Sequence, residues 1–157
     1  MQPTDQLTLA PAPPGTPDAE YCRRLCADGR DTGLLIDGER MLWQLQCGPL
    51  RLLATQCDYY DNLDHWIYLL SPDDRILDRL TLPIYVYDMQ DLRIESDTRI
   101  GFGFGESTDR WTVDLHPDGY WSFAPRAIYY RGSRLLFRRR YLTARRDRGG
   151  SRGSGQA

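Results

Sequence analysis

The sequence predicts a mainly β domain: an antiparallel meander, sandwich or partly open barrel of about eight to ten short strands, with one short N-terminal helix. Short apolar runs separated by turn-forming pairs, such as Asp37-Gly38 and Gly48-Pro49, favour hairpins and therefore antiparallel pairing. Long helical patterns do not alternate with these runs, which argues against a parallel α/β fold.

The one predicted helix begins near residue 16 and ends near residue 29. Thr16 suits an N-cap, Pro17 suits the first helical position, and Gly29 suits the end of a helix. At helical spacing, one face of this segment would carry Tyr21, Cys22, Leu25 and Cys26.

Further turns are expected within residues 71–74, near Asp97, and at 117–119 and 131–133. The stretch GFGFG, residues 101–105, alternates glycine with phenylalanine. Alternation predicts a strand with its two phenylalanines on one face, because successive strand residues point to opposite sides.

The composition suggests three segments along the chain. Residues 1–15 contain four prolines and no apolar pattern, so we expect a disordered arm. Residues 16–144 form the predicted single domain, and 145–157 read as a disordered tail rich in arginine and glycine. The N-terminus lacks a basic region followed by an apolar run, which favours a cytoplasmic protein.

Charge is divided unevenly along a chain that contains no lysine. Residues 131–157 hold nine arginines and one aspartate, a net +8, whereas residues 1–130 carry a net −10. Such asymmetry bears on binding partners rather than on the fold. The spacing of the four cysteines does not fit a zinc site, so we expect free thiols and neither metal nor cofactor.

The segment CDYYDNLDHW, residues 57–66, is the main candidate for function. Residues 58–97 hold ten acidic groups against three arginines, and tyrosines lie among the acids. Tyrosine supplies large contact area at protein interfaces, and carboxylates speed encounter with a basic partner. The predicted partner-binding residues are Asp58, Tyr59, Tyr60, Asp61, Asp64, Tyr85, Tyr87 and Asp88.

We interpret the chain as a non-catalytic protein-binding domain. The most concrete version is a bacterial, cytoplasmic inhibitor of immunity type, which would occlude the basic active site of a toxin or nuclease. The two histidines, His65 and His116, and the absence of a nucleophile-elbow motif give no support to an enzyme.

Two alternatives remain. The arginine-rich end suggests nucleic-acid binding through Arg138, Arg139, Arg140, Arg145 and Arg146. A small-ligand binder or enzyme built in a β-barrel would instead need a deep pocket lined by Trp43, Trp66 or Trp111.

Overall fold

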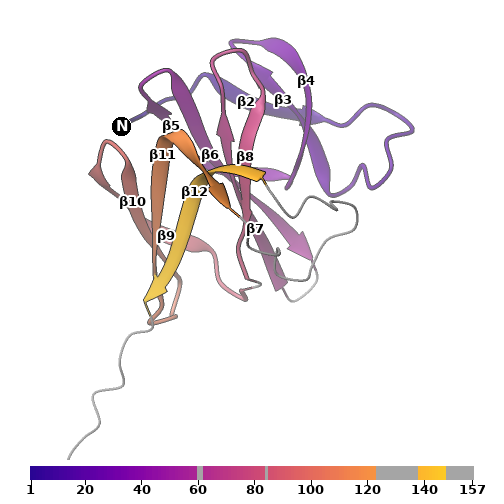
Figure 1. The fold of residues 1–157 in the computed structure, drawn as a ribbon. Coiled ribbons are helices and arrows are strands. Elements are labelled where there is room, and N and C mark those ends of the chain that lie inside the picture. Colours follow the sequence, from indigo (N-terminus) through magenta and orange to yellow (C-terminus); the bar gives the residue numbers. More distant parts are fainter. Residues whose placement is uncertain (60–61, 84, 123–137, 148–157) are drawn as a thin grey trace, which may run out of the picture.

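The computed structural model describes residues 1–59, 62–83, 85–122 and 138–147, which form strands, turns and loops but no helix (Figure 1). The strands are β1 (Gln2–Pro3), β2 (Leu7–Pro11), β3 (Cys22–Ala27), β4 (Arg30–Asp37), β5 (Arg40–Cys47), β6 (Leu50–Tyr59), β7 (Asn62–Leu70), β8 (Ile76–Thr81), β9 (Met89–Ser96), β10 (Arg99–Phe104), β11 (Arg110–Ser122) and β12 (Arg138–Asp147).

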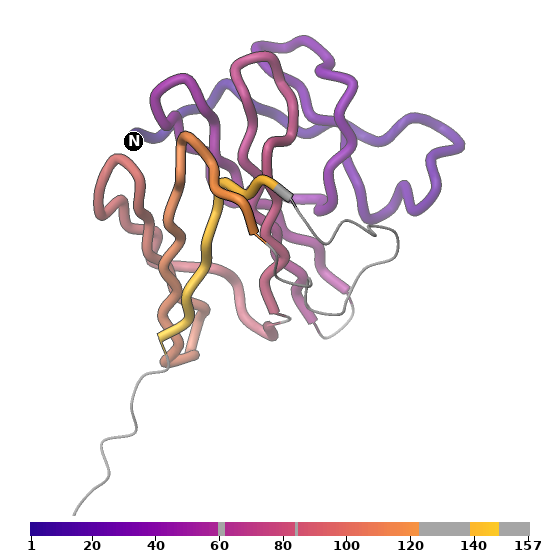
Figure 2. Tube along the Cα trace, viewed as in Figure 1, coloured from indigo at the N-terminus to yellow at the C-terminus, as the bar shows by residue number. Residues whose placement is uncertain are grey.

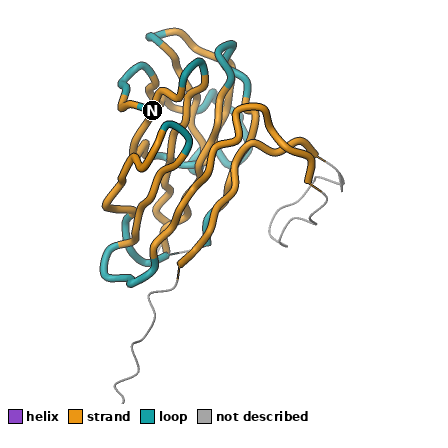
Figure 3. Tube along the Cα trace, turned by 60° about the vertical axis from the view of Figure 1, so that its left-hand side comes forward, coloured by secondary structure: helices purple, strands orange, loops and turns teal. Residues whose placement is uncertain are grey.

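These strands make three antiparallel sheets. The central sheet has the order β1-β5-β6-β7-β8, the N-terminal sheet β2-β3-β4, and the C-terminal sheet β12-β11-β10-β9. Figure 1 shows the central sheet between the other two, and Figure 3 shows the described chain as strands joined by loops. The trace in Figure 2 places the N-terminus beside the β9–β10 turn, where the Met1 amino group lies 2.7 Å from the Asp97 carboxylate.

Burial on both faces of the central sheet creates two cores. In β6, Leu52 and Ala54 pack toward the C-terminal sheet, whereas Leu53 and Cys57 pack toward the N-terminal sheet. This division follows from the alternation of side chains along a strand. Every residue of β6 from Leu50 to Cys57 is therefore buried.

A buried carboxylate joins the central and C-terminal sheets. Asp78, on β8, has no exposed side-chain surface. Its Oδ2 atom accepts hydrogen bonds from Arg140 Nε at 2.9 Å and from the backbone N–H groups of Tyr141 and Leu142 at 2.8 and 3.0 Å. This contact holds β12 against the edge of the central sheet.

The predicted antiparallel β class is confirmed, and so are three turns. Residues 48–49, 71–75 and 97–98 join β5 to β6, β7 to β8 and β9 to β10. The predicted strand in GFGFG is also confirmed, as β10, with Phe102 and Phe104 fully buried. On the other face of β10, the side chains of Glu95 and Arg110 lie over the two glycines.

The predicted N-terminal helix is wrong, because residues 22–27 form β3. Leu25 and Ala27 are buried and Cys26 is half-buried, an alternation with a period of two that the helical spacing concealed. Asp28 and Gly29 have φ values of 49° and 75° and connect β3 to β4. An Asp-Gly pair with two positive φ values is typical of a type I′ hairpin turn, so Gly29 belongs to a turn and not to a helix end.

Two predicted hairpin turns also have other roles. Asp37-Gly38 leads from β4 in the N-terminal sheet to β5 in the central sheet, and these strands do not pair. Residues 117–119 lie inside β11, which pairs with β12 on both sides of a register shift between Leu115 and Tyr120. A β-bulge accommodates turn-forming residues within a strand, which explains this second difference.

The predicted ends of the domain differ from the structure as well. We expected a disordered arm over 1–15, but Gln2–Pro3 and Leu7–Pro11 form strands. Leu7 is buried, and its backbone N–H and C=O are both bound by the Gln44 side-chain amide at 2.8 Å. β12 continues to Asp147, past the expected boundary at 144. The turn predicted at 131–133 and the tail from 148 lie outside the described residues.

We predict that Asp78→Ala lowers the free energy of unfolding by about 3–5 kcal/mol, because it leaves the half-buried Arg140 guanidinium and two backbone N–H groups without their acceptor. Asp78→Asn keeps one carbonyl oxygen and should lose less. Urea denaturation measures both. Asp31→Ala, which removes an exposed ion pair with Arg24 and an exposed hydrogen bond from the Gly33 N–H, is the matched control and should lower stability far less.

A second prediction concerns Gly38, where the chain passes from the N-terminal sheet to the central sheet. Its φ is 102°, and a Cβ atom there would lie 2.7 Å from Thr55 Cβ. Gly48 also has a positive φ, of 60°, but open space around it. Gly38→Ala should therefore cost about 1–3 kcal/mol more than Gly48→Ala in thermal or urea unfolding. Equal losses would contradict the role of this close contact.

Candidate functional site

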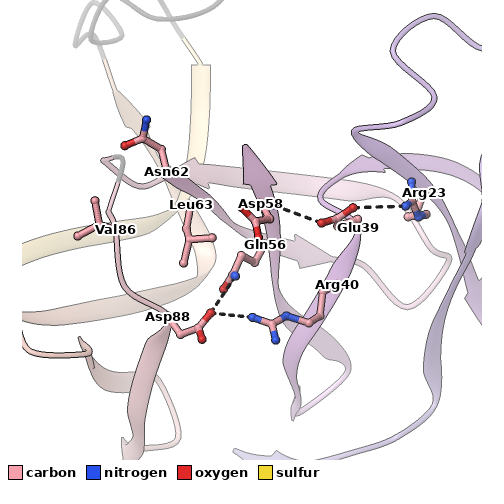
Figure 4. Close-up of a pocket in the computed structure, with 9 residues that line it drawn as sticks. All are labelled: Arg23, Glu39, Arg40, Gln56, Asp58, Asn62, Leu63, Val86 and Asp88. Carbon is pink, nitrogen blue, oxygen red and sulfur yellow. Dashed lines mark hydrogen bonds and ion pairs between the residues drawn. The ribbon is translucent and has the colours of Figure 1, made fainter. Parts of the chain in front are cut away.

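A polar pocket of about 850 Å³ opens at one end of the central sheet (Figure 4). It lies where β5 begins, β6 ends and β7 begins, with β3 on one side and residues 86–88 on the other. Backbone hydrogen bonds between Leu63 and Tyr85, at 2.7 and 3.2 Å, attach the segment before β9 to β7. The pocket is lined by Arg23, Glu39, Arg40, Gln56, Asp58, Asn62, Leu63, Val86 and Asp88.

Most of the charges in the pocket are already paired. Arg40 Nη2 lies 2.7 Å from Asp88 Oδ1, and Arg23 Nη2 lies 3.7 Å from Glu39 Oε2. The Asp58 backbone N–H donates to Glu39 at 3.3 Å. Within the described part of the chain, the Asp58 carboxylate makes no such ion pair. Asp58 therefore supplies the one negative charge that the pocket arginines do not balance.

One residue in the wall of the pocket, Gln56, is hydrogen-bonded to a buried histidine, His65. The Gln56 side chain is only 3% exposed; its Nε2 donates to Asp88 Oδ1 at 2.9 Å and its Oε1 lies 3.2 Å from His65 Nε2. Because the amide nitrogen faces Asp88, the histidine Nε2 is the donor to Gln56. His65 is fully buried against the Phe104 ring, and its Nδ1 has no partner among the described residues.

Burial lowers the pKa of His65 from its usual 6.5 to about 4. Removal from water disfavours the charged imidazolium, and no carboxylate of the described residues contacts the ring directly to offset that cost. The histidine is consequently neutral near pH 7 and adds no positive charge behind Gln56.

Large apolar side chains are exposed beside the pocket. Val86, which lines it, is 61% exposed, and the neighbouring Tyr87 is 37% exposed. Tyr59, which follows Asp58 on β6, is 44% exposed, and its ring centroid lies 5.0 Å from that of Tyr21. Exposed aromatic and aliphatic groups beside charged ones are typical of protein-binding surfaces.

The structure brings together only some of the predicted partner-binding residues. Asp58, Tyr59, Tyr87 and Asp88 lie in or beside the pocket. Tyr60 and Asp61 lie outside the described residues.

Two other predicted residues point elsewhere. Asp64 lies on the face of β7 shared with Trp66, toward the N-terminal sheet, and burial raises its pKa. Tyr85 stacks on Phe104 at 3.8 Å and bonds through its hydroxyl to Trp111 and Asp109, so it belongs mainly to the core.

The sequence reasoning missed Glu39, Arg40, Gln56 and Val86 as parts of the site. Arg40 and Asp88 are 48 residues apart, and no local spacing connects them. The one available signal was the charged pair Glu39-Arg40, which follows Asp37-Gly38 and to which the predicted hairpin gave no role.

The arginines proposed for nucleic-acid binding are largely engaged within the protein. Arg140 pairs with Asp78 at 2.9 Å, Arg145 with Asp114 at 3.2 Å, and Arg146 with Asp109. Arg139 donates to the backbone oxygen of Asp118, and the side chain of Arg138 lies outside the described residues. The positive charge of β12 is thus largely balanced by aspartates of the same domain.

The three tryptophans predicted to line a ligand pocket do not share one deep pocket. Trp66 is buried in the core beneath the N-terminal sheet, and Trp111 in the core beneath the C-terminal sheet. Trp43 lines a shallower groove of about 640 Å³ along β5 and donates to Met89 Sδ at 3.2 Å.

Two other kinds of feature are absent from the described residues. No three histidine, cysteine or carboxylate side chains among them are grouped as metal ligands would be. Nor do they form a helix long and apolar enough to cross a membrane. All four cysteines are free thiols, with Cys47 and Cys57 buried in separate cores.

Comparison of the chain with models of known protein families, with curated proteins and with solved structures finds no match. The geometry of the pocket and of its rim is therefore the basis for inferring a function.

The His65 pKa predicts how stability changes with pH. In the folded state, His65 becomes protonated only near pH 4, whereas in the unfolded chain it becomes protonated near pH 6.5. Stability should therefore fall as the pH drops from about 6.5 to 4, by on the order of 3 kcal/mol from this group. His65→Gln should flatten that part of the curve in urea denaturation, while His116→Gln should keep it. The same slope in both variants would contradict this assignment.

Proposed function

We propose that the protein is a non-catalytic binding domain whose pocket end associates with a basic cleft of another protein. The observation that carries this proposal is the uncompensated Asp58 carboxylate in a polar pocket, next to exposed Val86 and Tyr87. The combination offers apolar contact area and a negative charge on one surface.

The arrangement suits occlusion of a cleft rather than chemistry. Asp88 and Glu39 are held by Arg40 and Arg23, and His65 is buried behind Gln56. The described residues that line the pocket include no serine, threonine, cysteine, lysine or histidine, the side chains most often used as nucleophiles. Shape and charge would then provide the inhibition, as expected for an immunity-type inhibitor of a toxin or nuclease.

The distribution of charge supports a protein partner over a nucleic acid. Three arginines of β12 are paired with aspartates, so their binding to phosphate would require breaking ion pairs. The pocket end presents carboxylates instead, which attract a basic protein and repel phosphate.

Site-specific photo-crosslinking of the full chain tests the proposal. A benzophenone amino acid at Val86 should crosslink a basic protein from the native host, whereas the same group at Leu35, which is 45% exposed on β4, should not. Adding the chain to the captured protein should suppress its activity at a ratio of about 1:1. Equal capture from both positions, or undiminished activity, would refute the proposed function.

Charge reversal tests the electrostatic part separately. Asp58→Arg should slow association with the captured protein about tenfold or more at low salt, and added salt should shrink the difference. Asp31→Arg, on the N-terminal sheet, is the matched control and should change the rate far less. Stopped-flow or surface-plasmon measurements give these rates.

A further inference from the structure

We infer that the pocket receives an arginine side chain of the partner, with its guanidinium at Asp58 and its aliphatic stem along Leu63 and Val86. This inference rests on the proposed function and names the chemistry that the partner must present. It follows from the balance of charge, the distribution of apolar surface and the rigidity of the wall.

The net charge of the described lining residues lets the pocket bind one further cation. Among the described residues, three carboxylates and two guanidinium groups line it, which leaves one negative charge. Two of the carboxylates already face Arg23 and Arg40, so the remaining site is Asp58. A carboxylate can accept two parallel hydrogen bonds from one guanidinium, and the amide of Asn62 lines the same pocket as a further polar group.

The pocket also has apolar surface on which the aliphatic stem of a long cationic side chain can pack. Leu63 and Val86 line the pocket beside these polar groups, and Figure 4 shows Leu63 between Val86 and the Gln56–Asp58 pair. The methylene groups of arginine pack on such surface while the head binds the carboxylate. With a volume of about 850 Å³, the pocket has room for the side chain together with part of its backbone.

The wall of the pocket is held in place before any partner arrives. Gln56 is fixed between Asp88 and His65, and Leu63 is fixed by its paired backbone hydrogen bonds to Tyr85. A preformed site loses less conformational entropy on binding. The neutral His65 also leaves the incoming cation without repulsion from behind the wall.

A titration followed by NMR on the ¹⁵N-labelled full chain tests this inference, with N-acetyl-arginine amide as the probe. N-acetyl-citrulline amide, which has the same shape without the charge, is the control ligand. The arginine compound should shift the signals of Asp58, Leu63, Val86 and the Gln56 side-chain amide, with a Kd of about 1 mM or somewhat weaker. That is the affinity of one charge-assisted contact with modest apolar burial. The citrulline compound should bind at least about tenfold more weakly.

Variants complete the test. Asp58→Asn should weaken binding of the arginine compound about tenfold, whereas Asp31→Asn should leave it unchanged. Equal shifts from citrulline, or shifts that do not saturate or that map away from Asp58, would overturn the inference. If partner crosslinking at Val86 persisted in that case, the proposed function would stand without the arginine site. Arginine-specific binding without any captured protein would keep the site and remove the protein partner.

Discussion

The central sheet is covered on both faces, and the remainder of the architecture follows from that constraint. β6 and β7 alternate their side chains between two cores, so each face requires an apolar layer of its own. The N-terminal strands supply one layer and β9–β12 supply the other. The candidate site forms at the end of the central sheet, where β6 passes from fully buried residues to the exposed Asp58 and Tyr59.

Ion pairs in this protein connect layers and also neighbouring strands of one sheet. Asp78 binds β12, Asp109 and Asp114 bind its last arginines, and Arg40 binds the segment that precedes β9. Arginine suits these contacts because its planar head pairs with carboxylates and its stem covers apolar surface. The acidic body and basic C-terminal strand therefore complement each other within one chain. Among the described residues that line the pocket, Asp58 is the carboxylate that pairs with neither arginine.

Local patterns were enough to predict the class of fold and several turns, because alternation and turn residues act over a few positions. They failed where one stretch of sequence fitted two different structures. Tyr21, Cys22 and Leu25 fit helical spacing, yet Asp28-Gly29 makes a hairpin and the buried positions follow a period of two. They failed for the site too, since Arg40 on β5, Gln56 on β6 and Asp88 in the segment before β9 meet only in the assembled fold.

The bond between Asp78 and β12 has a consequence for how the chain acquires its structure. Its donors lie 62 to 64 residues further along the sequence, so the contact closes a very long loop. During synthesis, the strand β8 leaves the ribosome well before its acceptor group can be satisfied by protein. Until β12 arrives, that carboxylate stays hydrated and one side of the central sheet remains open. Consolidation of the last layer is then a late step, at the slow end of the range for proteins rich in distant contacts.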